Sequence, residues 1–283
     1  MKSILIADSG STKTDWCLLH QDGTATRVQT KGLNPFHMTK EEIGEELKAG
    51  LLPKLPTSEV CGVYFYGAGC TPEKQPVVAQ ALRDCLTITD DCEVASDMLG
   101  AARAICGHKP GIACILGTGS NSCAFDGCRI IKNVSPLGYI LGDEGSGAVL
   151  GRMLLGDIMK NQMPQHIIER FQEKYHFTNA DIIERVYRQK LPNRFLAGFA
   201  PFLYENINEP CIEALVKDGF RSFLQRNVRQ YDGWESLPIG FIGSIATVFR
   251  TQLGDVLAEE HMHQGQIIQA PMEGLVEFHK PRA

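Results

Sequence analysis

The chain has 283 residues, which favours two domains over one, because single hydrophobic cores stop growing near this length. Its residues are 43% hydrophobic and 22% charged, a composition that excludes disordered, collagen-like and coiled-coil chains. The net charge of -5, without basic runs, argues against nucleic acid as a partner. No apolar stretch is long enough to cross a bilayer and the N-terminus has no room for a signal-peptide core, so we expect a cytoplasmic protein without membrane contact.

The ten cysteines include no CxxC pair, so a zinc ribbon or a redox motif is poorly supported. Cys17, Cys61, Cys114 and Cys123 lie within apolar, strand-like runs. A free thiol in such a run behaves as a small hydrophobic side chain in a reducing compartment.

The chain opens with an apolar run at residues 4–7, a polar glycine turn at 8–14 and a second apolar run at 16–19. This pattern predicts a strand, a turn and a second strand. A dinucleotide fold or a P-loop would need a helix after the turn and a different glycine spacing, so both are disfavoured.

Alternating helices and strands follow. The periodicity predicts helices over 39–52, 76–86 and 98–105 and strands over 60–66 and 93–95. Such alternation is typical of an α/β chain with parallel strand pairing in part of each sheet.

The strand-turn-strand unit then recurs, with apolar runs at 112–116 and 123–125 flanking a Gly/Ser/Thr turn at 117–122. This internal duplication predicts two similar lobes whose hairpin tips face one another across a cleft.

The remaining chain is more helical. Apolar spacing predicts helices over 148–159, 165–175, 180–189, 209–231, 245–257 and 272–278, and a strand over 239–242. We therefore expect an N-terminal lobe of residues 1–109, joined by the segment 271–283, and a C-terminal lobe of residues 110–270.

The two turns suit phosphates, because backbone N–H groups of Gly, Ser and Thr can converge on an anion. A carboxylate such as Asp8 would repel a phosphate unless a cation lay between them, which points to Mg²⁺. The alternative is an ordinary hairpin tip, which uses the same residue types. Two such tips in one chain favour the phosphate interpretation.

Three other positions have both a functional and a structural interpretation. Asp97 follows a strand and precedes a helix, so it is either a general base or a helix-capping or first-turn carboxylate. Asp143 and Glu144 lie among four glycines before a helix, where they can bind a polyol or cap that helix. Asn34 precedes a proline, which a plain turn also explains.

Together these motifs resemble the superfamily of acetate and sugar kinases, heat-shock chaperones and actin. Residues 8–14 resemble its first phosphate motif, 117–120 its second, and Gly243-Ser244 its adenosine motif. The pairing of 117–121 with 141–146 is similar to the N-acetylglucosamine kinase group of the BadF/BadG/BcrA/BcrD ATPase family. The resemblance implies two ribonuclease-H-like lobes with a nucleotide cleft between them, closing on ATP, Mg²⁺ and an amino sugar, and is compatible with a homodimer.

The resemblance also implies roles for single residues. Asp97 would be the catalytic base, Asp8 would organise Mg²⁺, and the amino sugar would be bound by Asn34, Asp97, Asn121 and Asp143. The ATP-binding residues would be Gly10, Ser11, Thr12, Lys13, Thr14, Gly117, Thr118, Gly119, Ser120, Gly243 and Ser244.

Differences from the motifs of related sugar kinases indicate which branch of the superfamily this chain resembles. Ser9 and Ser11 stand where related sugar kinases often have glycine, and the metal-binding cysteine cluster of repressor-type sugar kinases is absent. We therefore expect an ATP-dependent kinase for N-acetylglucosamine or a relative such as N-acetylmuramic acid. An ATPase coupled to a partner protein, and a non-catalytic sugar sensor, are the alternatives.

Overall fold

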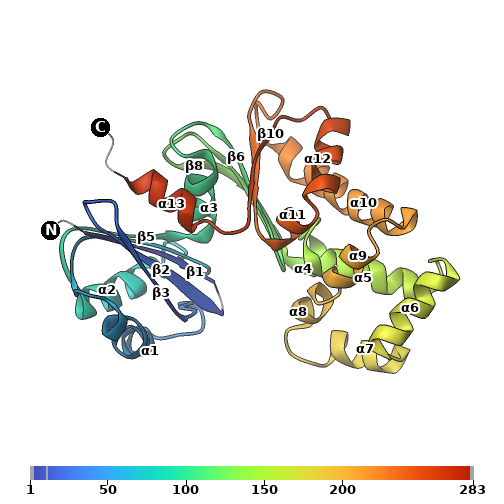
Figure 1. The fold of residues 1–283 in the computed structure, drawn as a ribbon, viewed down its shortest axis with the longest axis horizontal. Helices are drawn as coiled ribbons and strands as arrows, with labels where there is room; N and C mark the ends of the chain where they lie inside the picture. The colour runs from blue at the N-terminus through green and yellow to red at the C-terminus, as the bar shows by residue number, and fades with distance from the viewer. Residues whose placement is uncertain (1–2, 11, 281–283) are drawn as a thin grey trace. The chain divides into compact units, whose positions relative to one another are not determined.

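The computed structural model describes residues 3–10 and 12–280 (Figure 1). Ser11, one of the predicted phosphate contacts, lies outside the described residues. The chain divides into two compact units. The first consists of Met1–His108, Gly127–Arg129 and Ala270–Ala283, and the second of Lys109–Asp126 and Ile130–Gln269.

The first unit contains a five-stranded sheet in the order β3-β2-β1-β4-β5. Its strands are β1 (Ile4–Ser9), β2 (Lys13–Leu19), β3 (Ala25–Lys31), β4 (Glu59–Gly67) and β5 (Thr87–Ser96). Strands β1, β2 and β3 pair antiparallel, whereas β1, β4 and β5 pair parallel. Ser9 is paired with Gly67 and Gly67 with Ser96, so the carboxyl ends of the three parallel strands lie at one level.

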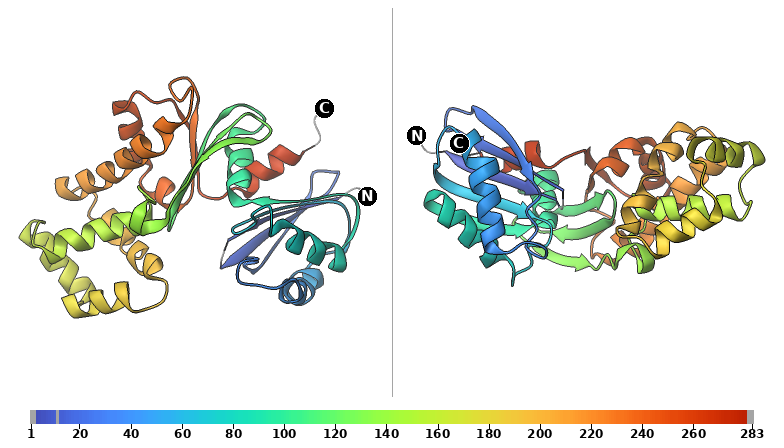
Figure 2. Two further views of the ribbon diagram at one scale, coloured as in Figure 1. Left: turned by 180° about the vertical axis from the view of Figure 1, so that it is seen from behind. Right: turned by 90° about the horizontal axis from the view of Figure 1, so that it is seen from below.

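Helices cover both faces of this sheet. Figures 1 and 2 show α1 (Lys40–Glu46) and α2 (Gln75–Cys85) on one face, and α3 (Asp97–Cys106) and α13 (Met272–His279) on the other. The helix predicted over 39–52 is α-helical only to Glu46; a π-helical turn, Leu47–Leu51, and a 3-10 turn, Leu52–Lys54, follow. Pro53 lacks the N–H that a continuing helix requires.

The sheet of the second unit has the same topology as the sheet of the first. Its sheet has the order β10-β9-β6-β7-β8, with strands β6 (Gly111–Leu116), β7 (Ser120–Phe125), β8 (Ile130–Val134), β9 (Ile239–Ile242) and β10 (Gln264–Ile268). Strands β6, β7 and β8 are antiparallel, and β6, β9 and β10 are parallel. Because each sheet joins an antiparallel meander to two parallel strands in the same order, the predicted duplication is confirmed.

Helices make up the rest of the second unit. They are α4 (Gly138–Leu141), α5 (Gly147–Met159), α6 (Gln165–Tyr175), α7 (Asn179–Tyr187), α8 (Pro192–Ala197), α9 (Ala200–Glu205), α10 (Pro210–Arg226), α11 (Ser244–Val248) and α12 (Arg250–Glu259). Among residues 3–10 and 12–280, no helix is both long and apolar enough to span a membrane.

Two helix predictions in this unit were wrong in extent. The helix predicted over 209–231 ends at Arg226, and a separate 3-10 turn, Val228–Gln230, follows Asn227. The helix predicted over 245–257 is two helices, because Phe249 has a non-helical backbone (φ -104°, ψ 33°) between α11 and α12. Phe249 is completely buried, so its packing outweighs local helix propensity.

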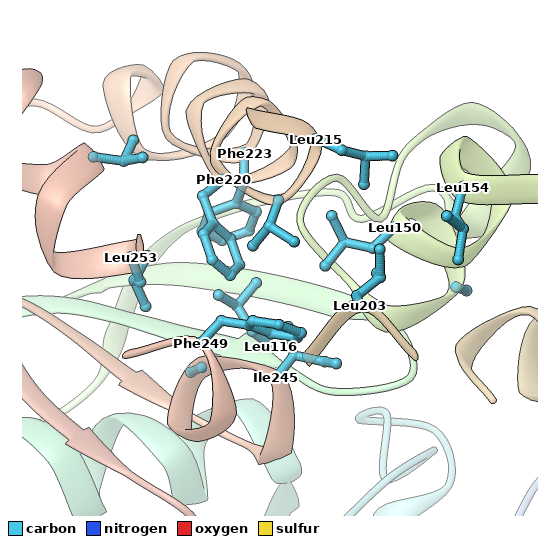
Figure 3. Close-up of a cluster of buried hydrophobic side chains, with 14 of the residues drawn as sticks. Leu116, Leu150, Leu154, Leu203, Leu215, Phe220, Phe223, Ile245, Phe249 and Leu253 are labelled. Carbon is cyan, nitrogen blue, oxygen red and sulfur yellow. The ribbon is translucent and has the colours of Figure 1, made fainter. Parts of the chain in front are cut away.

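The core of the second unit lies between its sheet and the helices α5, α10 and α12. Figure 3 shows Leu116 of β6, Leu150 of α5, Phe220 of α10 and Phe249 directed into one cluster. All four side chains are fully buried. This packing fixes the end of β6 and the start of α5, the elements that hold the second glycine turn.

Gly151 of α5 provides a test of this packing. A Cβ atom at Gly151 would lie 1.9 Å from the carbonyl oxygen of Leu196, so Gly151→Ala forces backbone apart and should destabilise the protein by about 2 kcal/mol. Gly156→Ala on the same helix meets nothing within 4 Å and should instead stabilise by about 0.5 kcal/mol through helix propensity. Thermal unfolding of both variants checks this, and equal melting temperatures would contradict the packing described here.

Candidate functional site

In the first unit, the predicted functional side chains gather at one edge of the sheet. Asp8 is the penultimate residue of β1, and Asp97 directly follows β5. Lys13 is the first residue of β2 and pairs with Lys31, the last residue of β3. Asn34 follows Lys31 by three positions. The parallel register described above brings these strand ends to the same edge.

The first glycine turn is closed by its own hydrogen bonds. The Gly10 N–H donates to the Lys13 carbonyl over 2.9 Å, and the hydroxyls of Ser9 and Thr14 share a 2.8 Å hydrogen bond. The Thr14 hydroxyl also donates to the Lys31 carbonyl over 3.0 Å. Because Ser9 and Thr14 are buried, their side chains hold the turn, whereas Gly10 and Thr12 are exposed.

Asp8 lies in an environment that disfavours a bare negative charge. Burial, with repulsion from Asp15 and Asp97, raises the pKa of Asp8 to about 7, and Lys13 opposes this only in part. Lys13 is itself ion-paired with Asp15 at 2.7 Å. A cation close to Asp8 would relieve this unfavourable charge.

Asp97 does not cap helix α3. The cap is Ser96, whose hydroxyl accepts the Leu99 N–H over 3.2 Å. Asp97 is the first helical residue, and its Oδ1 accepts the Met98 N–H over 2.8 Å. Burial raises the pKa of Asp97, although the backbone amides of Met98 and Asp97 oppose the shift.

Asn34 forms the turn that its sequence context suggested. Its Oδ1 accepts the Phe36 N–H over 2.9 Å, and its carbonyl accepts the N–H groups of His37 and Met38. The loop after β4 packs against it, because a Cβ at Gly69 would lie 2.4 Å from Asn34 Oδ1. Gly69 also has φ +78°, so glycine is required there on two counts.

In the second unit, the glycine turn after β6 is anchored to the start of α5. The Gly117 N–H donates to the Gly119 carbonyl over 2.9 Å, which closes the turn. The N–H groups of Gly147 and Ala148 donate to the carbonyls of Gly117 and Thr118 over 2.8 and 3.1 Å. The first amides of α5 are thus engaged in positioning the turn.

The two adjacent carboxylates after α4 have different environments. Asp143 has φ +52°, and its Oδ1 accepts the Ser120 N–H over 3.2 Å. Burial raises its pKa, which the Ser120 amide opposes. Glu144 instead forms an ion pair with Arg226 at 2.5 Å and accepts from Asn227. Glu144 therefore ties the loop to α10, while Asp143 lies against the second glycine turn.

Asn121 lies on β7, next to the second turn. Its Oδ1 accepts both the Ser122 N–H and the Asn133 side-chain amide, each over 2.9 Å. Its oxygen therefore contributes to the pairing of β7 with β8, and its amide nitrogen carries the N–H donors with which it can contact a ligand.

A pocket of about 390 Å³ adjoins the second turn and brings distant motifs together. It is lined by Gly117, Thr118, Ala197, Ala200, Pro201, Tyr204, Ser244, Ile245 and Val248. Gly243, beside Ser244, has φ +120°, and a Cβ there would lie 2.4 Å from the Leu116 carbonyl oxygen. The predicted second phosphate and adenosine motifs thus meet at one mainly apolar pocket, large enough for part of a small ligand.

Sequence reasoning missed the α8 and α9 residues of this pocket. Ala197, Ala200, Pro201 and Tyr204 belong to short helices that carry no glycine or charge motif. Their only sequence signals were Pro192 and Pro201 near two helix starts, which favour a helix but do not indicate a ligand.

The residues present fit magnesium that arrives with a nucleotide better than a resident metal ion. Within residues 3–10 and 12–280, no group of three or more His, Cys, Asp and Glu side chains is arranged to hold a metal by itself. Asp8, with its raised pKa and neighbouring Asp97, supplies carboxylate oxygen but too few ligands alone. Phosphate oxygens and water would have to complete the coordination.

Comparisons with solved structures concern the family and the fold. A "putative N-acetylglucosamine kinase" from Porphyromonas gingivalis is 52% identical, with a TM-score of 0.91 over 98% of both chains. The chain belongs to the same sugar-kinase family. A "putative N-acetylglucosamine kinase" from Chromobacterium violaceum shares the fold at 17% identity, with a TM-score of 0.74 over 98% of this chain and 99% of the other.

The fold is that of the actin-like ATPases. A MamK variant bound to AMPPNP superposes with a TM-score of 0.52 at 11% identity, over 99% of this chain and 98% of the other. No family model and no curated protein matches the chain. The predicted α/β fold with two similar halves is confirmed.

The raised pKa of Asp8 predicts a pH-dependent effect of Asp8→Asn. Unfolded Asp8 titrates near 3.8 and folded Asp8 near 7, so its ionisation lowers stability progressively between these values. The variant should gain about 4 kcal/mol over the wild-type protein at pH 8 and far less at pH 4, measured by denaturant unfolding without ligands.

Asp22→Asn is the control, because the pKa of Asp22 is lowered by folding whereas that of Asp8 is raised. Hydrogen bonds from Thr24 lower the pKa of the exposed Asp22, so its ionised form favours the folded state and the variant should gain no stability at pH 8. If Asp8→Asn showed the same difference from wild type at both pH values, Asp8 would have an ordinary pKa.

Proposed function

We propose that this chain transfers the γ-phosphoryl group of ATP to N-acetylglucosamine or a close relative such as N-acetylmuramic acid, at the 6-hydroxyl in the case of N-acetylglucosamine. The observation that carries the proposal is the proximity of Asp97 and Asp8 at the carboxyl edge of the first sheet, close enough for the charge of Asp97 to raise the pKa of Asp8. One carboxylate suits proton transfer and the other a cation, as phosphoryl transfer to an alcohol requires. Membership of a sugar-kinase family supports the same reaction.

Asp97 is assigned as the general base. As the sugar oxygen attacks the γ-phosphorus, the Asp97 carboxylate accepts the hydroxyl proton, the bond from the γ-phosphorus to the β,γ-bridging oxygen breaks, and ADP leaves. Its raised pKa makes Asp97 a better proton acceptor than an exposed carboxylate. The Met98 N–H bonded to Oδ1 directs the carboxylate, which leaves Oδ2 for the substrate.

Backbone groups of the two glycine turns are assigned to the phosphates. In the first turn, Gly10 and Thr12 are exposed, so a phosphate can approach the backbone closely. In the second turn, the Gly117 and Ser120 amides donate within the protein, so the amides of Thr118 and Gly119 are the ones assigned to a phosphate. Mg²⁺ bound with ATP would be held by Asp8 and would offset the negative charge of the phosphates. Lys13 adds positive charge at the first turn.

Asn34 and Asp97 of the first unit, and Asn121 and Asp143 of the second, are assigned to the sugar. Asn34 offers its amide N–H groups, because its oxygen is engaged by Phe36. Asp143 is held by Ser120 through Oδ1, so its Oδ2 is the atom assigned to accept from a sugar hydroxyl. The pocket beside Ser244 is assigned to the adenosine.

The first experiment is ADP release with Mg-ATP across N-acetylglucosamine, N-acetylmuramic acid, N-acetylmannosamine, glucose and no sugar. The proposal predicts release that depends on an N-acetyl amino sugar. Sugar-independent release would favour an ATPase coupled to a partner protein. Sugar binding by calorimetry without any release would favour a sensor.

Asp97→Asn tests the base. Loss of the proton acceptor should lower kcat by about 10³-fold while the Kd for the sugar changes less than about threefold, because the amide preserves size and hydrogen bonding. Steady-state kinetics and calorimetry measure the two quantities.

The control is Asp84→Asn, which alters an exposed carboxylate on α2 of the same unit and should leave kcat unchanged. Near-normal turnover of Asp97→Asn would return Asp97 to a purely structural first-turn role.

Ala200→Leu tests the adenosine pocket. The larger side chain would occupy part of a pocket of about 390 Å³, so the KM for ATP should rise at least about tenfold with the KM for the sugar unchanged. Ala258→Leu, at an exposed position of α12, should change neither constant. An unchanged KM for ATP in Ala200→Leu would place the nucleotide elsewhere.

A further inference from the structure

The helix that begins at Asp97 is seated directly on a tyrosine of the sheet. A Cβ atom at Gly100 of α3 would lie 2.8 Å from the Cβ of Tyr66 on β4, so no side chain fits between them. Tyr66 is only 1% exposed. Gly100 is about one helical turn from Asp97. The contact with Tyr66 therefore limits how the first turn of α3 can move relative to the sheet.

The Tyr66 hydroxyl joins two elements far apart in the sequence. Arg103 Nη1 of α3 lies 2.6 Å from it, and His279 Nε2 of α13 lies 2.7 Å from it. Arginine can only donate, so the phenol oxygen accepts from Arg103, and we assign the phenol proton to His279 Nε2 as its acceptor. This assignment puts the proton of the imidazole on Nδ1.

The charge state of His279 agrees with this assignment. Burial, together with the positive charge of Arg103 and the neighbouring His108, lowers the pKa of His279 to about 3. Burial also raises the pKa of Tyr66. A neutral imidazole thus accepts from a protonated phenol throughout the physiological pH range.

Helix α13 packs beside α3 on the same face of the sheet, and the two helices approach closely (Figure 1). A Cβ at Gly274 of α13 would lie 2.3 Å from the Ala104 carbonyl oxygen. The His279 ring stacks on Tyr64 with centroids 3.9 Å apart, and Phe278 stacks on His108 at 4.1 Å. Helix α3 is therefore in close contact with both β4 and the C-terminal helix.

Arg103 connects these contacts to the strand that precedes Asp97. Its Nη1 also pairs with Glu93 of β5 at 2.7 Å, and its guanidinium lies over the Phe278 ring at 5.0 Å. The side chain of Arg103 is only 12% exposed, and its buried Nε has no hydrogen-bond partner. Losing the Tyr66 hydroxyl would therefore further reduce the hydrogen bonding of a buried charge.

We propose that Tyr66, through Arg103 and His279, is a positioning residue that holds the first turn of α3, and with it Asp97, in the orientation needed for proton transfer. The C-terminal helix α13 thereby contributes to turnover without contacting substrate. This inference rests on the proposed role of Asp97 as the base.

Tyr66→Phe removes one oxygen atom and keeps the ring that packs against Gly100. It leaves Arg103 and His279 without their shared partner, so kcat should fall about tenfold while the KM values for ATP and sugar stay within about twofold. A purely structural tyrosine would lower the melting temperature without this selective loss of kcat.

Variants of His279 separate the hydrogen bond from helix packing in general. His279→Gln keeps an acceptor that can reach the phenol and should retain more kcat than His279→Ala. Glu273→Gln on the same helix removes only an exposed ion pair with Arg27 and should leave kcat unchanged. Equal kcat in His279→Gln and His279→Ala would overturn the assigned hydrogen bond.

Amide hydrogen exchange gives a measurement that does not need activity. Tyr66→Phe should speed exchange over residues 97–103 but not in α2. If the wild-type protein has no sugar-dependent turnover, the proposed function fails and exchange alone decides whether Tyr66 holds α3. If the wild-type protein is active, a Tyr66→Phe kcat within twofold of wild type overturns the positioning role.

Discussion

The alignment of three parallel strand ends is the constraint on which the first unit depends. Pairing of Ser9 with Gly67 and of Gly67 with Ser96 brings the residues that follow β1, β4 and β5 to one edge. A shift of one residue in either register would turn the side chains beyond it to the other face of the sheet. The proximity of Asp8 and Asp97, and the seating of Asn34 against Gly69, both follow from this register.

The second unit has the same sheet topology but different surroundings at its strand ends. Its glycine turn accepts hydrogen bonds from the first amides of α5. The backbone at Gly243 packs directly against the Leu116 carbonyl oxygen, which leaves no room for a side chain. Together these two segments line an apolar pocket, and Asp143 lies against the same turn.

The sequence predicted the duplicated strand-turn-strand units because their apolar runs and glycine turns are local signals. It missed three of the four outer strands of the two sheets, β3, β8 and β10, which carry exposed polar residues and thus lack a continuous apolar run. Motif resemblance indicated Asp97 and Asp143 as site residues. Only the structure shows that Ser96, not Asp97, caps α3. Only the structure shows that Glu144, not Asp143, forms the ion pair with Arg226.

Contacts between distant residues account for what the sequence could not predict. Tyr66 and His279 are 213 positions apart, and no local pattern connects a strand tyrosine to a histidine near the C-terminus. The same holds for the pocket, where residues of α8 and α9 meet Gly117 and Ser244 only in the folded chain. Such contacts depend on tertiary packing, which overrides local propensity.

The most direct test of the account is to identify the product. The protein is incubated with Mg-ATP and N-acetylglucosamine, and the mixture is followed by phosphorus and proton NMR. The account predicts one sugar phosphate, with phosphorus coupled to the protons on carbon 6, formed in equal amount to ADP. ADP accompanied by inorganic phosphate and unchanged sugar would contradict it.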